Sequence, residues 1–363
     1  MEISTKTKLG LIFLVIACLI GVVTSLIVNY VVTTQIIFEA QERVKEHLSS
    51  ARWVFDSKIR DIDQPIRWTS IRDVVRKAVK KGDISSIRGE LTGLMVQEKL
   101  DFLTLVNRDG AVIFRFNNPD ISGDSLLKDP FIKKALVRKP VLGTQVLSRE
   151  ELMKEGEDLA RRATFTLVPV PKAKPIEKME ETSGMVLKSA RPIVDLNGDV
   201  LGVLMGGILV NRNYEVVDQI KNIVFKDARY KAKEIGTATI FLGDLRISTN
   251  VLDKEGSRAV GTHAMKEVRE QTLERGVPWI HRAFVVDDWY ITAYEPIKDV
   301  EDKIVGMLYV GMLENKYADI KEKLILFFFL FSMAGMLIAL TVSFLLSWRL
   351  MNKYYSTPFV PRL

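Results

Sequence analysis

The sequence contains a single cysteine, Cys18, and only three histidines among its 363 residues. One cysteine cannot form an intrachain disulfide, so the chain must fold without a disulfide framework. The histidines His47, His263 and His281 are isolated, and none belongs to a His, Cys or carboxylate cluster with the spacing of metal ligands. The sequence therefore predicts no metal site, and these histidines are expected to have structural or surface roles.

Catalytic and nucleotide-binding motifs are also missing. The chain has no Gly-x-Ser-x-Gly, no HExxH and no P-loop pattern. Gly202, Gly206 and Gly207 do not form a dinucleotide fingerprint, and glycines within a strand usually mark close packing or a bulge. The net charge of +7 is dispersed and forms no dense basic run of the kind that binds nucleic acid. We expect a protein that is not an enzyme and has neither a cofactor nor a nucleic-acid partner.

Charge is absent from two long segments, Leu9–Thr34 and Leu324–Trp348. At about 1.5 Å per residue, a helix of either length crosses a hydrocarbon core of about 30 Å. A cleaved signal peptide is the alternative for the first segment, but its apolar region would be only about 7–15 residues long. An uncleaved anchor is therefore favoured. Basic residues at both outer flanks place both ends in the cytoplasm. The chain is expected to cross the bacterial inner membrane twice, with residues 35–323 outside the cytoplasm.

The region between these segments contains both helical and strand patterns. Apolar residues at helical spacing predict one long N-terminal helix over residues 35–76, interrupted near Pro65. Asp101–Asn118 is typical of a β-hairpin, because two alternating segments flank Arg108-Asp109-Gly110. Pro169–Thr182 is rich in Pro, Lys and Glu, which indicates a surface insertion loop.

An internal repeat relates two stretches that lie 104 positions apart. The second stretch is WYITAYEPIKDVEDKIVGMLYVGMLEN (residues 289–315), and its residues 296–315 match residues 192–211 at eight of twenty positions without a gap. The matched residues of the first copy are Pro192, Ile193, Asp195, Gly202, Leu204, Gly207, Leu209 and Asn211. Two hairpins can share glycine and aliphatic bias by chance, but the matched Pro, Asp and Asn favour a duplicated module. Each copy follows the order strand, strand, helix, strand, strand, strand, which predicts an antiparallel sheet with helical cover.

At these residues the chain resembles a bacterial double-Cache sensor, in which two PAS-like modules stand above a membrane. The segments that carry the resemblance are ATIFLGDLRISTNV, GSRAVGT, WIHRAFVVDDWYITAYEPI and GMLYVGMLE, within residues 237–314. The resemblance implies an α+β fold, with two antiparallel-sheet modules on a long N-terminal helix between two transmembrane helices. It also implies the extracytoplasmic sensor region of a histidine kinase or a methyl-accepting chemoreceptor.

The last residues resemble the start of a HAMP linker, which commonly opens around a proline such as Pro358 in Ser356-Thr357-Pro358-Phe359. Pro361 departs from that pattern, since a second proline disfavours continuation of a helix. No kinase, methyl-accepting or cyclase domain is seen, and the chain is expected to stop where a signalling module would begin. The expected parts are a cytoplasmic tail (1–8), a transmembrane helix (9–34), the long N-terminal helix (35–76), a membrane-distal module (77–212), a connecting helix (213–235), a membrane-proximal module (236–314), a second membrane helix with its lead-in (315–350) and the start of the linker (351–363).

Candidate ligand-binding residues in the proximal module follow from strand alternation. Tyr290, Thr292 and Tyr294 share one face of a strand, and Arg282 lies in the middle of the preceding strand. An arginine flanked by tyrosine hydroxyls can hold a carboxylate through a bidentate contact. The alternative is a surface arginine beside core tyrosines.

Candidates in the distal module are Arg115, Asn117, Lys188 and Arg191. Alternation places Lys188 and Arg191 on opposite faces of one strand, so these two cations need not share a pocket. The alternative is a solvated sheet edge. With cationic candidates in both modules, the natural hypothesis is a small anionic ligand.

These observations favour a membrane-anchored sensor of a small molecule. A shift of the proximal sheet would move the second membrane helix, which follows its last strand. The apolar stripe of the long N-terminal helix predicts a parallel homodimer. Two alternatives remain open: a protein-interaction platform without a small ligand, and a membrane enzyme with an external active site, for which no clustered acid, base or metal set is found.

Overall fold

A computed structural model describes residues 5–175, 178–226, 229–231 and 233–355. Residues 41–314 form one compact unit, and residues 1–40 together with 315–363 form another. Residues 1–4 of the expected tail and Ser356-Thr357-Pro358-Phe359 of the expected HAMP-like linker lie outside the described residues.

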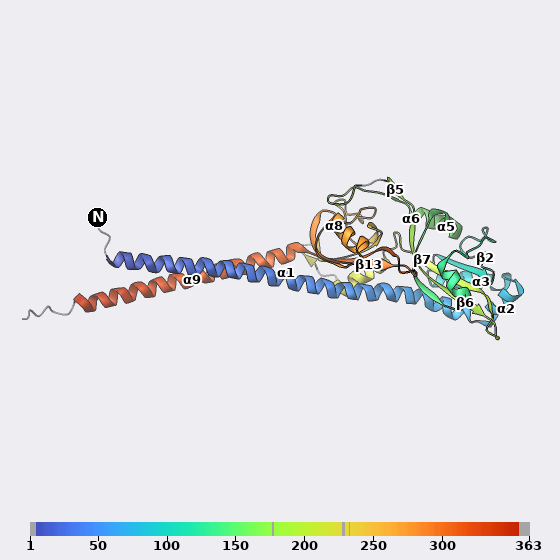
Figure 1. Ribbon diagram of the computed structural model, residues 1–363, viewed down its shortest axis with the longest axis horizontal. Coiled ribbons are helices and arrows are strands. Elements are labelled where there is room, and N and C mark those ends of the chain that lie inside the picture. The colour runs from blue at the N-terminus through green and yellow to red at the C-terminus, as the bar shows by residue number, and fades with distance from the viewer. Residues whose placement is uncertain (1–4, 176–177, 227–228, 232, 356–363) are drawn as a thin grey trace, which may run out of the picture. The chain divides into compact units, whose positions relative to one another are not determined.

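The two charge-free segments lie within two long helices. These are α1 (Thr5–Ser70) and α9 (Glu314–Tyr355), marked in Figure 1. Both are long and apolar enough to cross a membrane, and none of their most apolar stretches is buried within the protein. Large apolar side chains such as Leu26 and Phe331 are therefore exposed, as expected for helix surfaces that face lipid.

The long helix ends earlier than its sequence pattern predicts. It continues through Pro65 but stops at Ser70 rather than Arg76. The backbone turns there, with the Arg72 amide donating to the Thr69 carbonyl at 3.2 Å, and Arg72 is extended. The chain then forms α2 (Asp73–Lys81) and α3 (Ser85–Gln97).

The first sheet has the strand order β2-β1-β7-β6-β3, and all neighbouring strands are antiparallel. Its strands are β1 (Phe102–Asn107), β2 (Val112–Arg115), β3 (Val141–Leu147), β6 (Gly184–Val194) and β7 (Val200–Leu209). One face packs against α4 (Pro130–Leu136), α5 (Arg149–Glu155) and α6 (Glu157–Ala163), which share its apolar core. We call this part the distal module.

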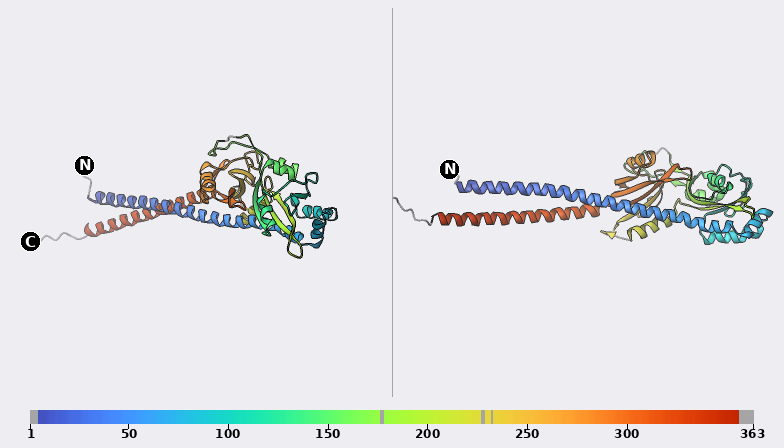
Figure 2. Two further views of the ribbon diagram at one scale, coloured as in Figure 1. Left: turned by 45° about the vertical axis from the view of Figure 1, so that its right-hand side comes forward. Right: turned by 60° about the horizontal axis from the view of Figure 1, so that its bottom comes forward.

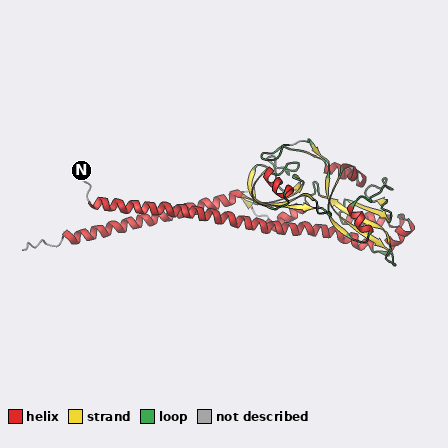
Figure 3. Ribbon diagram, in the orientation of Figure 1, coloured by secondary structure: helices red, strands yellow, loops and turns green. Residues whose placement is uncertain are grey.

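The second sheet repeats that order as β11-β10-β14-β13-β12, again antiparallel throughout. Its strands are β10 (Gly236–Leu242), β11 (Leu245–Thr249), β12 (Trp279–Val285), β13 (Asp288–Lys298) and β14 (Ile304–Leu313). Its core cluster includes Val268 of the short helix α8 (Lys266–Arg269), and Leu273 of the π-helical turn η2 (Glu270–Glu274) packs against it. We call this part the proximal module. Figure 3 shows the strands of both sheets in yellow, and the predicted α+β class is confirmed.

The 104-residue repeat is also a structural repeat. The pairing of β6 with β7 recurs in β13 with β14 at the same shift, including a register shift at the end of each pair. Asp195 and Asp299 make the same turn, in which one carboxylate oxygen accepts two backbone amides. Glycine is required at the matched positions Gly202 and Gly306, because a Cβ at either would overlap a backbone oxygen of the neighbouring strand.

Residues 41–70 of α1 run along both sheets, as both views of Figure 2 show. Asp63 accepts hydrogen bonds from Ser189 Oγ at 2.6 Å and from Arg191 Nε at 2.7 Å. Arg52 donates from Nε to Glu295 Oε1 at 2.7 Å. The buried apolar residues of this half are Val44, Leu48, Ala51, Val54, Phe55, Ile62 and Ile66. The apolar stripe that was expected to pair with a second copy is thus covered by the protein's own sheets.

The connection between the modules is not the single helix expected over residues 213–235. It consists of α7 (Glu215–Ile220), the π-helical turn η1 (Lys221–Phe225) and two short strands, β8 (Arg229–Tyr230) and β9 (Lys233–Glu234). Helical geometry ends at Lys226, whose φ of 49° is left-handed.

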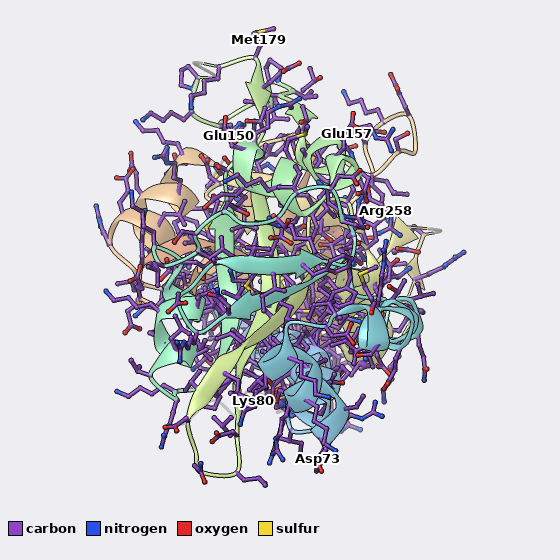
Figure 4. The ribbon with its side chains drawn as sticks, turned by 90° about the vertical axis from the view of Figure 1, so that its right-hand side faces the viewer. Asp73, Lys80, Glu150, Glu157, Met179 and Arg258 are labelled. Carbon is purple, nitrogen blue, oxygen red and sulfur yellow. The ribbon has the colours of Figure 1, made fainter. Side chains whose placement is uncertain are left out.

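The expected insertion loop lies between β4 (Phe165–Thr166) and the end of β5 (Glu180–Glu181), which pair as a small ribbon. Met179 is exposed at the tip of this loop (Figure 4). The described part of the loop agrees with a surface insertion.

Candidate ligand-binding site

A cavity of about 230 Å³ lies in the distal module between the sheet and its covering helices. Strands contribute Phe102, Arg115, Gln145, Leu147, Lys188 and Met205 to its walls. The segment before α4, the first residue of α4 and helix α5 contribute the others: Ser125, Leu126, Lys128, Asp129, Pro130, Glu151, Lys154 and Glu155. This volume is below the roughly 300–1,000 Å³ of pockets that hold drug-sized ligands, so the cavity suits a smaller molecule.

Arg115 is buried and is held by two carboxylates. Its Nη1 and Nη2 donate to the two oxygens of Asp124 at 2.6 and 3.0 Å, and its Nε donates to Glu155 Oε1 at 3.0 Å. Glu155 is fixed from its other oxygen by Thr104 Oγ1 at 2.5 Å. Although burial opposes it, this bonding raises the pKa of Arg115. With its donors directed to these carboxylates, Arg115 forms a fixed wall of the cavity rather than a free anion-binding group.

Lys188 reaches the cavity from β6, which is separated from β2 of Arg115 by β1 and β7. Its Nζ donates to Asp129 Oδ2 at 2.6 Å and lies 4.4 Å from the centre of the Phe131 ring. Asp129 also caps α4, because its Oδ1 accepts the amides of Phe131 and Ile132 at 2.8 and 3.3 Å. One carboxylate therefore links a cation in the cavity to the start of α4.

The cavity lining is nearly balanced in charge. Arg115, Lys128, Lys154 and Lys188 are basic, and Asp129, Glu151 and Glu155 are acidic. Gln145 adds a buried side-chain oxygen, Oε1, that has no hydrogen-bond partner among the described residues. An unsatisfied acceptor in such a place calls for a donor. A ligand with both an N–H donor and an acceptor for lysine would match this lining.

The other two distal candidates lie outside the cavity lining. Arg191 faces α1 and binds Asp63. Asn117 donates from Nδ2 to the Glu155 carbonyl at 3.1 Å and borders a separate surface hollow with Gly156 and Asp158. Asn117 supports the helix that carries Glu155, and Arg191 attaches the sheet to α1.

The proposed grouping of Arg282 with Tyr290, Thr292 and Tyr294 does not occur. The side chain of Arg282 is 57% exposed, stacks 4.0 Å from the centre of the Trp289 ring and pairs with Glu314 at 3.2 Å. Thr292 donates to the His281 carbonyl at 2.7 Å. The two tyrosines belong to the buried core of the proximal module.

Sequence reasoning missed Arg246, the arginine that lies with these tyrosines in the interior. The alternation of Leu245-Arg246-Ile247 within a predicted strand was an available signal, since one face of that strand had to point inward. It also missed Asp129, Glu155 and Gln145, for which the sequence gives no comparable signal.

Comparison with protein families identifies one segment. Residues 208–324 match the family described as "Single cache domain 3". The match includes all five strands of the proximal sheet, β10 to β14. The distal sheet has the same strand order but lies almost wholly outside the matched residues. No curated protein matches the chain.

Three solved structures align with most of this chain at low sequence identity and with TM-scores below 0.5. The periplasmic domain of Vibrio cholerae LuxQ is 11% identical, with a TM-score of 0.42, over 74% of this chain and 98% of that one. The ligand-binding domain of Campylobacter jejuni chemoreceptor Tlp3, solved with L-valine, is 10% identical, with a TM-score of 0.42, over 80% and 98%. The ligand-binding domain of Pseudomonas aeruginosa PAO1 chemoreceptor PctB, solved with L-Arg, is 14% identical, with a TM-score of 0.36, over 76% and 94%.

The Arg115–Asp124 pair predicts a defined acid dependence. The hydrogen bond from Arg115 lowers the pKa of Asp124 from 3.8 to about 2. A depressed pKa stabilises the fold above the unfolded-state value, and this stability is lost as pH falls through about 2. Asp124→Asn should therefore cost about 2 kcal/mol at neutral pH, and the difference from wild type should shrink between about pH 4 and pH 2.

Thermal unfolding of the full chain in detergent from pH 7 to pH 2 measures this. Asp109→Asn is the matched control, since the side chain of Asp109 is 75% exposed, and it should follow the wild-type curve. Equal melting temperatures of Asp124→Asn and wild type at pH 7 would contradict the assignment.

Proposed function

Because residues 208–324 match the single Cache domain family, we propose that this protein is a two-pass sensor of the bacterial inner membrane. Residues 35–323 lie outside the cytoplasm and bind a small molecule. The protein then transmits binding through α9 to a cytoplasmic signalling module of the kind found in histidine kinases or chemoreceptors. The two apolar helices and the basic residues at their outer flanks support this topology.

The ligand binds in the distal cavity and is a small zwitterion, such as a free amino acid. The observation that carries this is the near balance of charge around about 230 Å³, with Gln145 Oε1 buried and unpaired. A ligand ammonium donates to Gln145, and a ligand carboxylate accepts from lysine. A dianion fits less well, because it would also meet Asp129, Glu151 and Glu155.

Transmission begins at α4. Asp129 at its start contacts Lys188 in the cavity, and Lys134 near its end donates to the carbonyl of Val300. Val300 lies in the turn between β13 and β14, and its side chain packs against the distal core. A ligand that repositions Asp129 therefore acts on a helix that touches the proximal hairpin.

The proximal hairpin leads directly into the membrane helix. β14 ends at Leu313 and α9 begins at Glu314, with no linker residue between them. Arg282 on β12 pairs with Glu314 at 3.2 Å, which ties the first residue of α9 to the sheet. If the hairpin has two conformations, a ligand shifts the equilibrium between them only to the extent that it binds one more tightly than the other.

The sensor acts as a parallel homodimer. The outer surface of α1 carries two exposed tryptophans, Trp53 and Trp68, with relative exposures of 62% and 60%. Fifteen residues at about 100° each place them within about 60° of one another around the helix. Large exposed aromatic side chains on one helix face favour a protein interface.

Binding is tested by isothermal titration calorimetry of the full chain in detergent with a panel of free amino acids, organic acids and amines. An amino acid should bind at least about tenfold more tightly than its deaminated or decarboxylated analogue, because either loss leaves a buried group unpaired. Lys188→Met and Gln145→Leu should each weaken binding about tenfold. Arg282→Met, which is remote from the cavity, should not. If no compound of the panel binds, the alternative of a protein-interaction platform without a small ligand is favoured.

Transmission is tested at Val300. Val300→Ser should leave the dissociation constant within about twofold of wild type, because Val300 does not line the cavity. The readout is disulfide crosslinking in membranes between two copies of a chain that carries Gly335→Cys and Cys18→Ser. Ligand should change the crosslinking rate of this chain, and adding Val300→Ser should make that change smaller. Leu196 is the matched control: it occupies the equivalent turn of the distal module and is 92% exposed. If Leu196→Ser reduces the effect of ligand on the crosslinking rate as strongly as Val300→Ser does, the route through α4 is wrong.

The dimer is tested with Trp68→Cys in the same Cys18→Ser background. Membranes should give a disulfide-linked dimer within minutes of mild oxidation, since a parallel pair brings the two copies of one residue together. Asp109→Cys, on the exposed turn of the distal hairpin, should crosslink far more slowly. Absence of any Trp68→Cys dimer would argue against α1 as the interface.

A further inference from the structure

A segment of the distal module lies across the proximal module. Residues 164–173, which we call the strap, follow α6 and run over the loop that precedes α8. The Val168 amide donates to the Gly261 carbonyl at 2.9 Å, and the Lys266 amide donates to the Lys172 carbonyl at 2.9 Å. Lys266 is the first residue of α8, so the strap accepts a hydrogen bond from an amide that has no acceptor within that helix. The strap is thus bonded to the proximal module at two points.

The start of the strap is fixed close to the distal cavity. Arg212 Nη1 donates to the carbonyls of Arg162 and Thr164 at 2.9 and 2.7 Å. The guanidinium carbon of Arg212 also lies 4.2 Å from the centre of the Phe165 ring. The helix that precedes the strap, α6, begins one residue after α5 ends, and α5 contributes Glu155 to the cavity wall. A displacement of α5 therefore reaches the strap through one short helix.

The far end of the strap contacts the residues that hold the start of α9. The Lys172 ammonium lies 5.1 Å from the centre of the Trp289 ring, and the Arg282 guanidinium carbon lies 4.0 Å from the same centre. Arg282 in turn pairs with Glu314, the first residue of α9, at 3.2 Å. Cations are attracted to the face of an indole ring. Trp289 therefore has one partner on the strap and one partner on β12.

The backbone of Lys172 is in the left-handed region, with a φ of 66°. Residues that carry a Cβ rarely adopt this conformation, and where it occurs it is held by the surrounding structure. Here the carbonyl of Lys172 accepts the bond from α8 while its side chain lies over Trp289. The two contacts together hold the turn, so the position of the Lys172 side chain depends on the strap staying in place.

We propose that the strap regulates the start of α9. While the strap is bound to the proximal module, Lys172 keeps the ring of Trp289 against Arg282, and Arg282 keeps Glu314 on the sheet. Trp289 is a positioning residue, because it acts on α9 only through Arg282. Detachment of the strap releases Glu314 and loosens the first turns of α9. The inference rests on the proposed function, since the distal cavity supplies the signal through α5 and α6, and it adds a second route to the one through α4 and Val300.

The strap is tested by locking it reversibly to the proximal module. Ala173 and Met265 oppose each other in an antiparallel bridge, and the hydrogen bond from α8 lies beside them. They therefore form a closely spaced, non-hydrogen-bonded pair, whose spacing suits a disulfide. A full chain with Ala173→Cys, Met265→Cys and Cys18→Ser is studied in detergent by hydrogen–deuterium exchange and mass spectrometry. Exchange of residues 314–321 should be at least about twofold slower in the oxidised protein than in the same protein reduced with dithiothreitol.

Adding Lys172→Asn to the locked chain should abolish this difference. Asparagine tolerates the left-handed backbone but is too short and uncharged to hold Trp289. Lys174→Asn is the matched control: Lys174 is exposed in the same loop, and its replacement should leave the difference unchanged. Equal exchange of the oxidised and reduced proteins would overturn the proposal, and so would a lock that protects α9 equally well with Lys172→Asn.

The measurement contains no ligand, so it separates the strap from the proposed ligand. If the lock slows exchange in α9 but no amino acid binds in calorimetry, the strap is supported and the proposed ligand is wrong. If amino acids bind but the lock has no effect on α9, the binding proposal stands and the strap does not regulate α9.

Discussion

The attachment of both modules to one helix is the constraint on which the rest of the structure depends. Arg191 and Glu295 are equivalent positions of the 104-residue repeat, and both bind α1, through Asp63 and Arg52. These helix residues are eleven positions apart, about 16 Å along the axis. The charges are reversed between the two pairs, so each sheet has its own place on the helix. Because α1 covers one face of each sheet, the covering loops and helices pack on the other face, where the distal cavity lies.

The two modules share a topology but compensate their buried arginines differently. In the distal module, two carboxylates hold Arg115, and the cavity beside it is nearly neutral. In the proximal module, Arg246 lies among neutral tyrosines, so its charge is not balanced by the described residues. Duplication of a fold fixes the path of the backbone, whereas the charge of the interior depends on a few side chains. The same sheet therefore surrounds its buried arginine differently in its two copies.

The contact between the modules uses the repeat asymmetrically. Val300 and Leu196 occupy the same position of equivalent turns, but Val300 packs against the distal core while Leu196 is exposed. The turn of the proximal hairpin therefore contacts the neighbouring module, whereas the equivalent residue of the distal turn is exposed. The proximal hairpin also continues directly into α9. The two copies of the repeated turn therefore have different environments, although their backbones are equivalent.

The sequence by itself determined the two long apolar helices, the repeat and the strands around it, because each depends on local features: length without charge, spacing of apolar residues, and Asp or Gly at turns. It also placed Lys188 and Arg191 on opposite faces. Only the tertiary structure decided which groups meet. Arg115 finds Glu155 forty residues away, Lys188 finds Asp129, and the tyrosines surround Arg246 instead of Arg282. Alternation tells which residues share a face of a strand, but the face that is covered depends on packing by distant segments, which the local sequence does not contain.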